Sequence, residues 1–166
     1  MQNVHDTQRC ARKLSPIRSE AAMSDDDLAT AYRAWIDELW NGDLDALDDV
    51  VARLVSDDFV GSWPGAAGMV RGRTALAEVV RAGRLPFDGL IFDIEVGPIV
   101  SGDLVAGRWV GRGEYAGGAH ALPGATAPAG TAVEFRGHDI MRFSDGVFVE
   151  YWVISEGEHL MAQLTG

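Results

Sequence analysis

The spacing of apolar residues changes once along this 166-residue chain, and that change constrains the fold more than any other feature. Between about residues 28 and 82, apolar residues recur at intervals of three and four, which is the period of amphipathic helices. From Leu90 onwards, apolar and polar residues alternate, which is the period of strands. Helices followed by a run of antiparallel strands are typical of α+β proteins. We therefore expect one α+β domain over residues 24–166.

Capping and turn residues divide the two halves into elements. Ser24 and Asp27 have the spacing of a helix N-terminal cap, and Asn41-Gly42-Asp43 ends the first predicted helix. Residues 116–130, rich in Gly, Ala and Pro, are expected to form a long loop. The remaining predicted helices cover about residues 44–55, 74–82 and 158–164, and the predicted strands cover 90–96, 104–115, 133–143 and 147–155.

Charge and cysteine content exclude several classes of function. Fourteen Lys and Arg against 25 Asp and Glu give a formal net charge of −11, and phosphate backbones or anionic membranes require clustered cations. We therefore expect no nucleic-acid partner and no membrane partner. The single cysteine, Cys10, can form no intramolecular disulfide and no zinc cluster. Residues 1–23 are basic and lack the apolar run of a secretory signal, so we expect a disordered tail on a cytoplasmic protein.

The last two predicted strands carry an acid among apolar residues. Asp139 falls on the same face of its strand as Phe135 and Met141. A two-residue turn at Asp145-Gly146 would pair Asp139 with residue 152, and a three-residue turn that includes Ser144 would pair it with residue 151. The three-residue turn separates apolar from polar side chains more cleanly, so we predict that Tyr151 lies beside Asp139.

A carboxyl group in apolar surroundings has a raised pKa and can act as an acid or base near neutral pH. Tyr151 can donate a hydrogen bond to such a group. We therefore take Asp139 and Tyr151 as candidate catalytic residues. The structural alternative is that Asp139 caps a loop or forms an ion pair with an arginine.

Aromatic residues on the predicted inner faces indicate a pocket for a flat, apolar ligand. Plain core packing is the alternative reading of the same pattern. The candidate substrate-binding residues come from the first helix, from a turn-rich segment around Phe59 and from the strands, and they are Tyr32, Trp35, Trp40, Trp63, Trp109, Tyr115, Phe135, Met141 and Val153.

Three further polar residues are secondary candidates. His138 shares the polar strand face with Glu150, where a solvated or interface histidine is the alternative to a catalytic one. His120 lies in the long loop, where it can act only as part of a lid. Because adjacent strand residues point to opposite faces, we do not expect His138, Asp139 and Glu150 to bind a metal ion together.

Several motifs resemble those of SnoaL-like polyketide cyclases. The closing hairpin, from Gly137-His138-Asp139 through Asp145-Gly146 to Glu150-Tyr151-Trp152, is similar to theirs, as are Trp40-Asn41-Gly42-Asp43 and Arg71-Gly72-Arg73. The resemblance covers about residues 25–166, apart from the loop over residues 116–130. It implies the nuclear-transport-factor-2-like cone, in which a curved antiparallel sheet wraps around a cavity that helices close.

The resemblance also implies a function. It implies cofactor-independent acid–base chemistry in the cavity. Asp139 lies where these cyclases have an acid or a histidine in the pocket, and Trp40 lies where they have an aromatic residue. The aldol-type cyclases carry an aspartate just after the tryptophan of the last strand, where this chain has Val153. It further implies a homodimer, with Arg142, His138 and Glu150 at a possible contact.

We therefore expect a cyclase of natural-product biosynthesis that acts on a hydrophobic polyketide or prenylated intermediate. The ring can close through a C–O bond, by opening of an epoxide, or through a C–C bond. An epoxide hydrolase, a dehydratase or an isomerase in the same pocket is the second hypothesis. A non-catalytic module that binds small molecules is the third.

Overall fold

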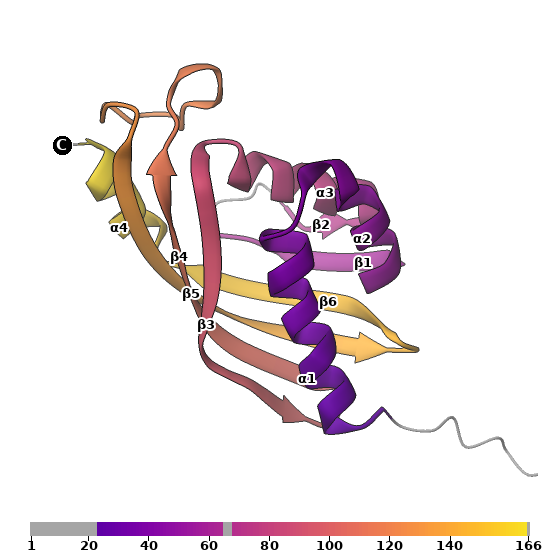
Figure 1. Ribbon diagram of the computed structural model, residues 1–166. Helices are drawn as coiled ribbons and strands as arrows, with labels where there is room; N and C mark the ends of the chain where they lie inside the picture. Colours follow the sequence, from indigo (N-terminus) through magenta and orange to yellow (C-terminus); the bar gives the residue numbers. More distant parts are fainter. Residues whose placement is uncertain (1–22, 65–67, 166) are drawn as a thin grey trace, which may run out of the picture.

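The computed structural model describes residues 23–64 and 68–165, so all of the predicted tail over residues 1–23 except Met23 lies outside the described residues. Four helices and six strands alternate with short single turns of 3-10 or π geometry (Figure 1). In chain order the elements are α1 (Asp25–Ala34), η1 (Trp35–Trp40), η2 (Leu44–Ala46), α2 (Leu47–Leu54), β1 (Val55–Ser62), β2 (Val70–Arg71), α3 (Gly72–Arg84), β3 (Phe87–Ser101), β4 (Leu104–Tyr115), η3 (Gly118–His120), β5 (Thr131–Ser144), β6 (Val147–Ser155) and α4 (Gly157–Thr165).

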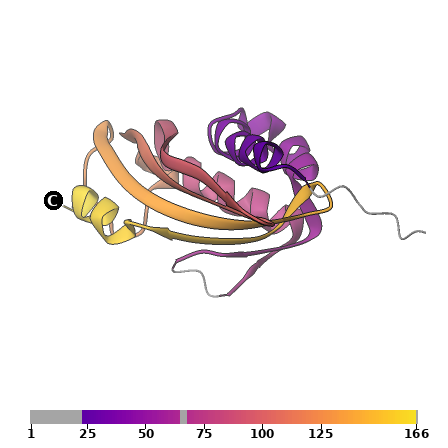
Figure 2. The same cartoon turned by 90° about the horizontal axis from the view of Figure 1, so that it is seen from below.

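The six strands form one curved sheet in the order β2-β1-β6-β5-β4-β3. Helices α1, α2 and α3 lie over its concave face, and α4 lies at one end (Figures 1 and 2). This arrangement confirms the predicted α+β class. The sheet differs in one respect from the wholly antiparallel, barrel-like sheet that the resemblance implies. It is mixed and unclosed, because β1 pairs with β6 in parallel while every other neighbouring pair is antiparallel.

Strand β1 occupies a segment for which we predicted the end of a helix and then turns. In this strand Ser56 is half-buried and Asp57 and Asp58 are exposed, while Val55 and Phe59 are buried. The partner β2 has only two residues, so one side of β1 is nearly an edge where polar residues are tolerated. This local arrangement produces no clear alternation in the sequence.

The end of the first helical segment is fixed by Asn41. After a capping box between Ser24 and Asp27, α1 continues into the π-helical turn η1. The side chain of Asn41 then donates to the carbonyl of Phe92 and accepts from its N–H, both over 2.8 Å, as a neighbouring strand would. These two bonds join the end of η1 to β3 and hold Trp40 over the concave face.

The β5–β6 hairpin differs from the prediction in its turn. The turn has two residues, Asp145 and Gly146, both with positive φ, and a bulge then inserts one extra residue in β6. As a result, Asp139 pairs with Val153 and Tyr151 pairs with Met141. The predicted three-residue turn and the pairing of Asp139 with Tyr151 are therefore wrong. The predicted face is correct, because the bulge leaves Tyr151 on the same side of the sheet as Asp139.

Candidate active site

A cavity of about 200 Å³ lies between the concave face of the sheet and the helices. Its wall is mainly aromatic, and among the described residues the only side-chain hydroxyl groups that line it belong to Tyr151 and Ser155. No charged side chain contributes to this described wall. The lining residues are Ile36, Trp40, Trp63, Gly83, Phe87, Phe92, Trp109, Leu122, Phe135, Tyr151, Val153, Ser155 and Leu160.

Asp139 lies directly behind this wall and is 3% exposed. The Tyr32 hydroxyl donates to its Oδ1 over 2.6 Å, and the Tyr151 hydroxyl donates to its Oδ2 over 3.1 Å. Of these three residues only Tyr151 lines the cavity. A proton that moves between Asp139 and the cavity through this trio must therefore pass through Tyr151.

Burial sets the protonation of the three groups. It raises the pKa of Asp139 to about 6, against the lowering caused by hydrogen bonds from Tyr32 and Tyr151. Burial and the nearby carboxylate raise the pKa of both tyrosines well above the ordinary value. Both hydroxyl groups are therefore protonated donors at neutral pH, and Asp139 can gain or lose a proton near pH 6.

Two glycines on the concave face make room for this arrangement. Gly107 pairs with Asp139 across the sheet, and a Cβ atom there would lie 2.2 Å from the Tyr32 hydroxyl oxygen. A Cβ atom at Gly137 would lie equally close to the ring of Trp109. Tyr32 and Trp109 can thus approach the sheet backbone only because these positions carry no side chain.

The structure brings six of the predicted substrate-binding or catalytic residues to the cavity wall. They are Trp40, Trp63, Trp109, Phe135, Tyr151 and Val153. The other four predicted substrate-binding residues are buried and do not line the cavity. Tyr32 donates a hydrogen bond to Asp139, and Trp35 packs on Tyr151 with ring centroids 5.0 Å apart. Tyr115 and Met141 lie in the core.

Sequence reasoning missed part of the wall. Phe87 and Phe92 lie in or just before the segment predicted as the first strand, but periodicity did not separate cavity-lining residues from those that only pack in the core. Leu122 lies in the long loop and Leu160 in α4, and no periodic pattern links either residue to the concave face. The tertiary fold brings these residues from β3, the loop and α4 to one cavity.

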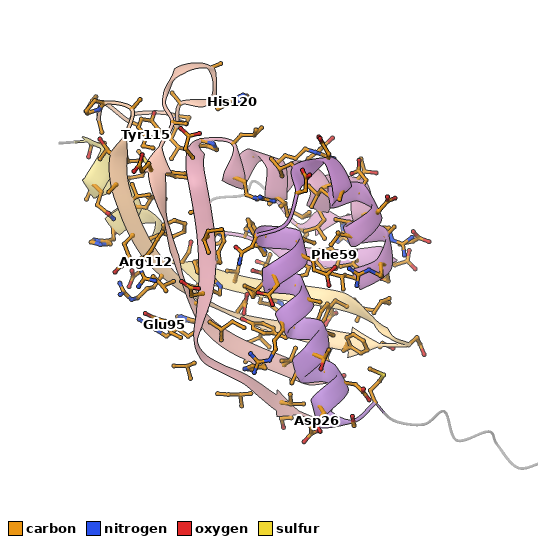
Figure 3. All side chains as sticks on the ribbon, in the orientation of Figure 1. Asp26, Phe59, Glu95, Arg112, Tyr115 and His120 are labelled. Carbon is orange, nitrogen blue, oxygen red and sulfur yellow. The ribbon has the colours of Figure 1, made fainter. Side chains whose placement is uncertain are left out.

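The secondary candidates lie away from the cavity. His138 is exposed on the convex face, and Glu150 on that face accepts a hydrogen bond from Arg142 over 2.8 Å. His120 is exposed on the loop beyond the end of the sheet (Figure 3). Within residues 23–64 and 68–165, no three His, Cys, Asp or Glu side chains gather as a metal site requires.

A curved sheet with helices over its concave face matches the fold of SnoaL-like proteins. Residues 32–151 match the family described as the SnoaL-like domain. The chain therefore belongs to the SnoaL-like family. A search of curated proteins finds no match. None of the described helices is both long enough and apolar enough to cross a membrane.

Several solved structures share this fold. IdmH from Streptomyces antibioticus, a candidate polyketide cyclase, is 26% identical, with a TM-score of 0.67 over 82% of this chain and 97% of its own. A candidate SnoaL-like polyketide cyclase from Jannaschia sp. CCS1 is 18% identical, with a TM-score of 0.74 over 93% and 98%. AclR from Streptomyces galilaeus, a candidate hydroxylase, is 20% identical, with a TM-score of 0.69 over 85% and 82%.

Proposed function

We propose that the protein is a cyclase that closes a ring in a polyketide-type or prenylated intermediate, with Asp139 and Tyr151 moving the proton and without a cofactor. Membership of the SnoaL-like family and similarity to IdmH, a candidate polyketide cyclase, support the class of reaction. The observation that carries the proposal is the buried Asp139 carboxyl group, which contacts an apolar cavity through one tyrosine.

The carboxyl group acts as a base in this mechanism. Both of its oxygen atoms accept hydrogen bonds from tyrosine hydroxyl groups, an arrangement that suits the ionised form. A pKa of about 6 leaves most of Asp139 ionised at pH 7. Burial then makes the carboxylate a stronger base than an exposed aspartate.

In ring closure by epoxide opening, Asp139 and Tyr151 first remove a proton from the substrate and then return one to it. A substrate hydroxyl group gives its proton to the Tyr151 oxygen while Tyr151 passes its own proton to Asp139 Oδ2. The substrate oxygen forms the new C–O bond as the epoxide C–O bond breaks. The epoxide oxygen then takes a proton from Tyr151, and Asp139 returns a proton to Tyr151. No atom is gained or lost, so the cyclic ether has the mass of the substrate.

The cavity wall favours ring closure over addition of water. Trp40, Trp63 and Trp109, together with the neighbouring phenylalanines, leave a narrow apolar space that selects a folded substrate and lowers the entropic part of the barrier. An ordered attacking water needs two to four polar partners, and the described wall offers few polar groups. We therefore prefer the cyclase to the hydrolase.

Mass spectrometry of metabolites tests the class of reaction. The gene is deleted in its native host, and the intermediate that accumulates is compared with the product that is lost. A cyclase gives an intermediate and a product of equal mass, and nuclear magnetic resonance of both then distinguishes a new ring from another isomerisation. A difference of one water supports the hydrolase or dehydratase, and an unchanged profile supports the non-catalytic binding module.

A further inference from the structure

Leu122 forms part of two different surfaces. It lines the cavity, and it also lines an outer groove between the end of α3 and the loop that joins β4 to β5. It is the one residue that these two linings share. Its side chain is half-buried and packs against the core, while residues 118–121, 123 and 124 around it are exposed. Leu122 thus lies between the apolar cavity and the shallower outer groove.

The segment that carries Leu122 is bonded mainly to itself. Within the described residues, the hydrogen bonds of residues 117–124 stay inside the loop, from the N–H of Ala121 to Gly118 and from that of Ala125 to Leu122. The next part of the loop is fixed to the fold, because Thr126 and Ala127 both donate to the carbonyl of Leu164 in α4. A change of side chain at Leu122 therefore disturbs no hydrogen bond between elements.

The two spaces that Leu122 separates suit different chemical groups. A dry cavity of about 150 Å³ holds one benzene ring, so about 200 Å³ holds roughly one to two rings or a short alkyl chain. The outer groove is lined by Glu78, Arg81 and His120, which favour a hydrated group, and by Ala82, Leu85 and Pro86, which offer further apolar contact. An amphipathic molecule with its apolar end in the cavity meets Leu122 at this boundary.

We infer that Leu122 is the end wall of the substrate cavity and sets the length of the apolar group that the protein accepts. The inference rests on the proposed function only in taking this cavity as the substrate site, and it requires no turnover. With Leu122 in place, an apolar chain longer than the cavity finds no further apolar contact. Without it, the chain continues into the outer groove.

Binding of primary alcohols with six to fourteen carbons tests this inference. The fluorescence of Trp40, Trp63 and Trp109 reports occupation of the cavity, since all three rings line it. In the unmodified protein, affinity rises about threefold to fourfold for each added CH₂ until the cavity is full, and it then levels off. Leu122→Ala should move this limit two or three carbons higher, and Leu122→Phe should move it lower.

Leu85→Ala is the matched control, because Leu85 lines the outer groove but not the cavity. In this variant, affinity should level off at the same alcohol chain length as in the unmodified protein. An unchanged limit in both Leu122 variants, with alcohols still bound, overturns the role of Leu122 and leaves the proposed function standing. Absence of any alcohol-dependent fluorescence change in every variant overturns both, because the cavity then takes no apolar ligand.

Discussion

The hydroxyl oxygen of Tyr32 lies 2.6 Å from Asp139 Oδ1, although 107 positions separate the two residues in the chain. Helix α1 crosses the concave face of the sheet and brings Tyr32 into the space above Gly107. The carboxyl group is thereby held between a tyrosine that does not line the cavity and a tyrosine that does. This relationship yields direct predictions about pH, stability and packing.

Tyr32→Phe should raise the pKa of Asp139 further. The Tyr32 hydroxyl stabilises the ionised carboxylate, and a hydrogen bond to a charged group contributes roughly 1.5–3 kcal/mol, which corresponds to about one to two pH units. Since the base form is needed, the midpoint of the rise of kcat/KM with pH should move from about 6 upwards. Tyr115→Phe is the control, because Tyr115 is also buried but makes no bond to Asp139.

The pH profile of the unmodified protein is a separate prediction. With Asp139 as the base, kcat/KM should rise with pH, with a midpoint near the pKa of about 6, and reach a plateau above pH 7. Stopped or continuous assays between pH 5 and pH 8 measure this directly. A profile that falls through the same range would mean that Asp139 acts as an acid instead.

Asp139→Asn should stabilise the protein at pH 7. The pKa of the folded state, about 6, lies above the ordinary value of 3.8, so the folded state binds more protons between these values. The carboxyl group therefore stabilises the fold fully below about pH 3.8 and loses this contribution as the pH rises through about 6. The difference corresponds to roughly 3 kcal/mol at neutral pH.

Urea unfolding at pH 7 and at pH 4 checks this sign. Asp139→Asn should have the larger free energy of unfolding at pH 7, and the gap should narrow towards pH 4. A variant that is much less stable than the unmodified protein at pH 7 would show that the carboxylate is retained for stability. That result would favour the structural role of Asp139 over the catalytic one.

Gly107→Ala should destabilise the protein through Tyr32. The new Cβ atom would lie 2.2 Å from the Tyr32 hydroxyl oxygen, so the ring or the strand must move. Such overpacking costs about 1–3 kcal/mol, or several degrees in Tm. Gly157→Ala, where no atom lies within 4 Å of the added Cβ, should leave Tm nearly unchanged. Equal Tm values in both variants would contradict the close approach of Tyr32.

The convex face bears on the expected homodimer. We predicted a polar face there, but Ile140, Trp152 and Ile154 are 46%, 39% and 63% exposed, next to the ion pair of Arg142 and Glu150. We propose that a second copy of the chain covers this face, because an apolar row beside charges of both signs can complement itself about a two-fold axis. The exposed apolar row then becomes buried between the two sheets.

Sedimentation of the unmodified protein and of Trp152→Glu tests the dimer. The unmodified protein should sediment at twice 17.8 kDa, and Trp152→Glu should sediment as a monomer. Leu85→Glu is the control, since Leu85 has the same 39% exposure but lies just beyond α3, on the helix side of the sheet. A monomer at high concentration of the unmodified protein would rule out the dimer.

Much of the fold could be predicted, because the spacing of apolar residues and the turn residues determine secondary structure locally. The alternation over 104–115 and 147–155 matches β4 and β6 at both ends. The bulge in β6 could not be predicted, since an extra residue in one strand changes the pairing without changing the composition. Strand β1 was missed because Asp57 and Asp58 are exposed beside a two-residue partner, so the segment lacks the apolar alternation of a strand.

For the candidate site, the sequence predicts only the face of the sheet on which the residues lie. Alternation placed Asp139 and Tyr151 on the apolar side of the hairpin, where the structure has them. The bond from Tyr32 depends on where α1 crosses the sheet, and helical period gives the inner face of a helix but not its position over the strands. The same limit explains why Trp35 was expected in the cavity wall and lies behind Tyr151 instead.

The intermediate that accumulates on gene deletion allows the sharpest test of the Asp139–Tyr151 pair. Purified unmodified protein and Asp139→Asn are each given this intermediate, and formation of the product of equal mass is followed over time. Unmodified protein should convert it, whereas Asp139→Asn should bind it, as shown by tryptophan fluorescence, and form the product at least a hundredfold more slowly, roughly the contribution of one acid–base group. Turnover by Asp139→Asn at a rate near that of the unmodified protein would contradict proton transfer through this pair and leave ring closure to the shape of the cavity alone.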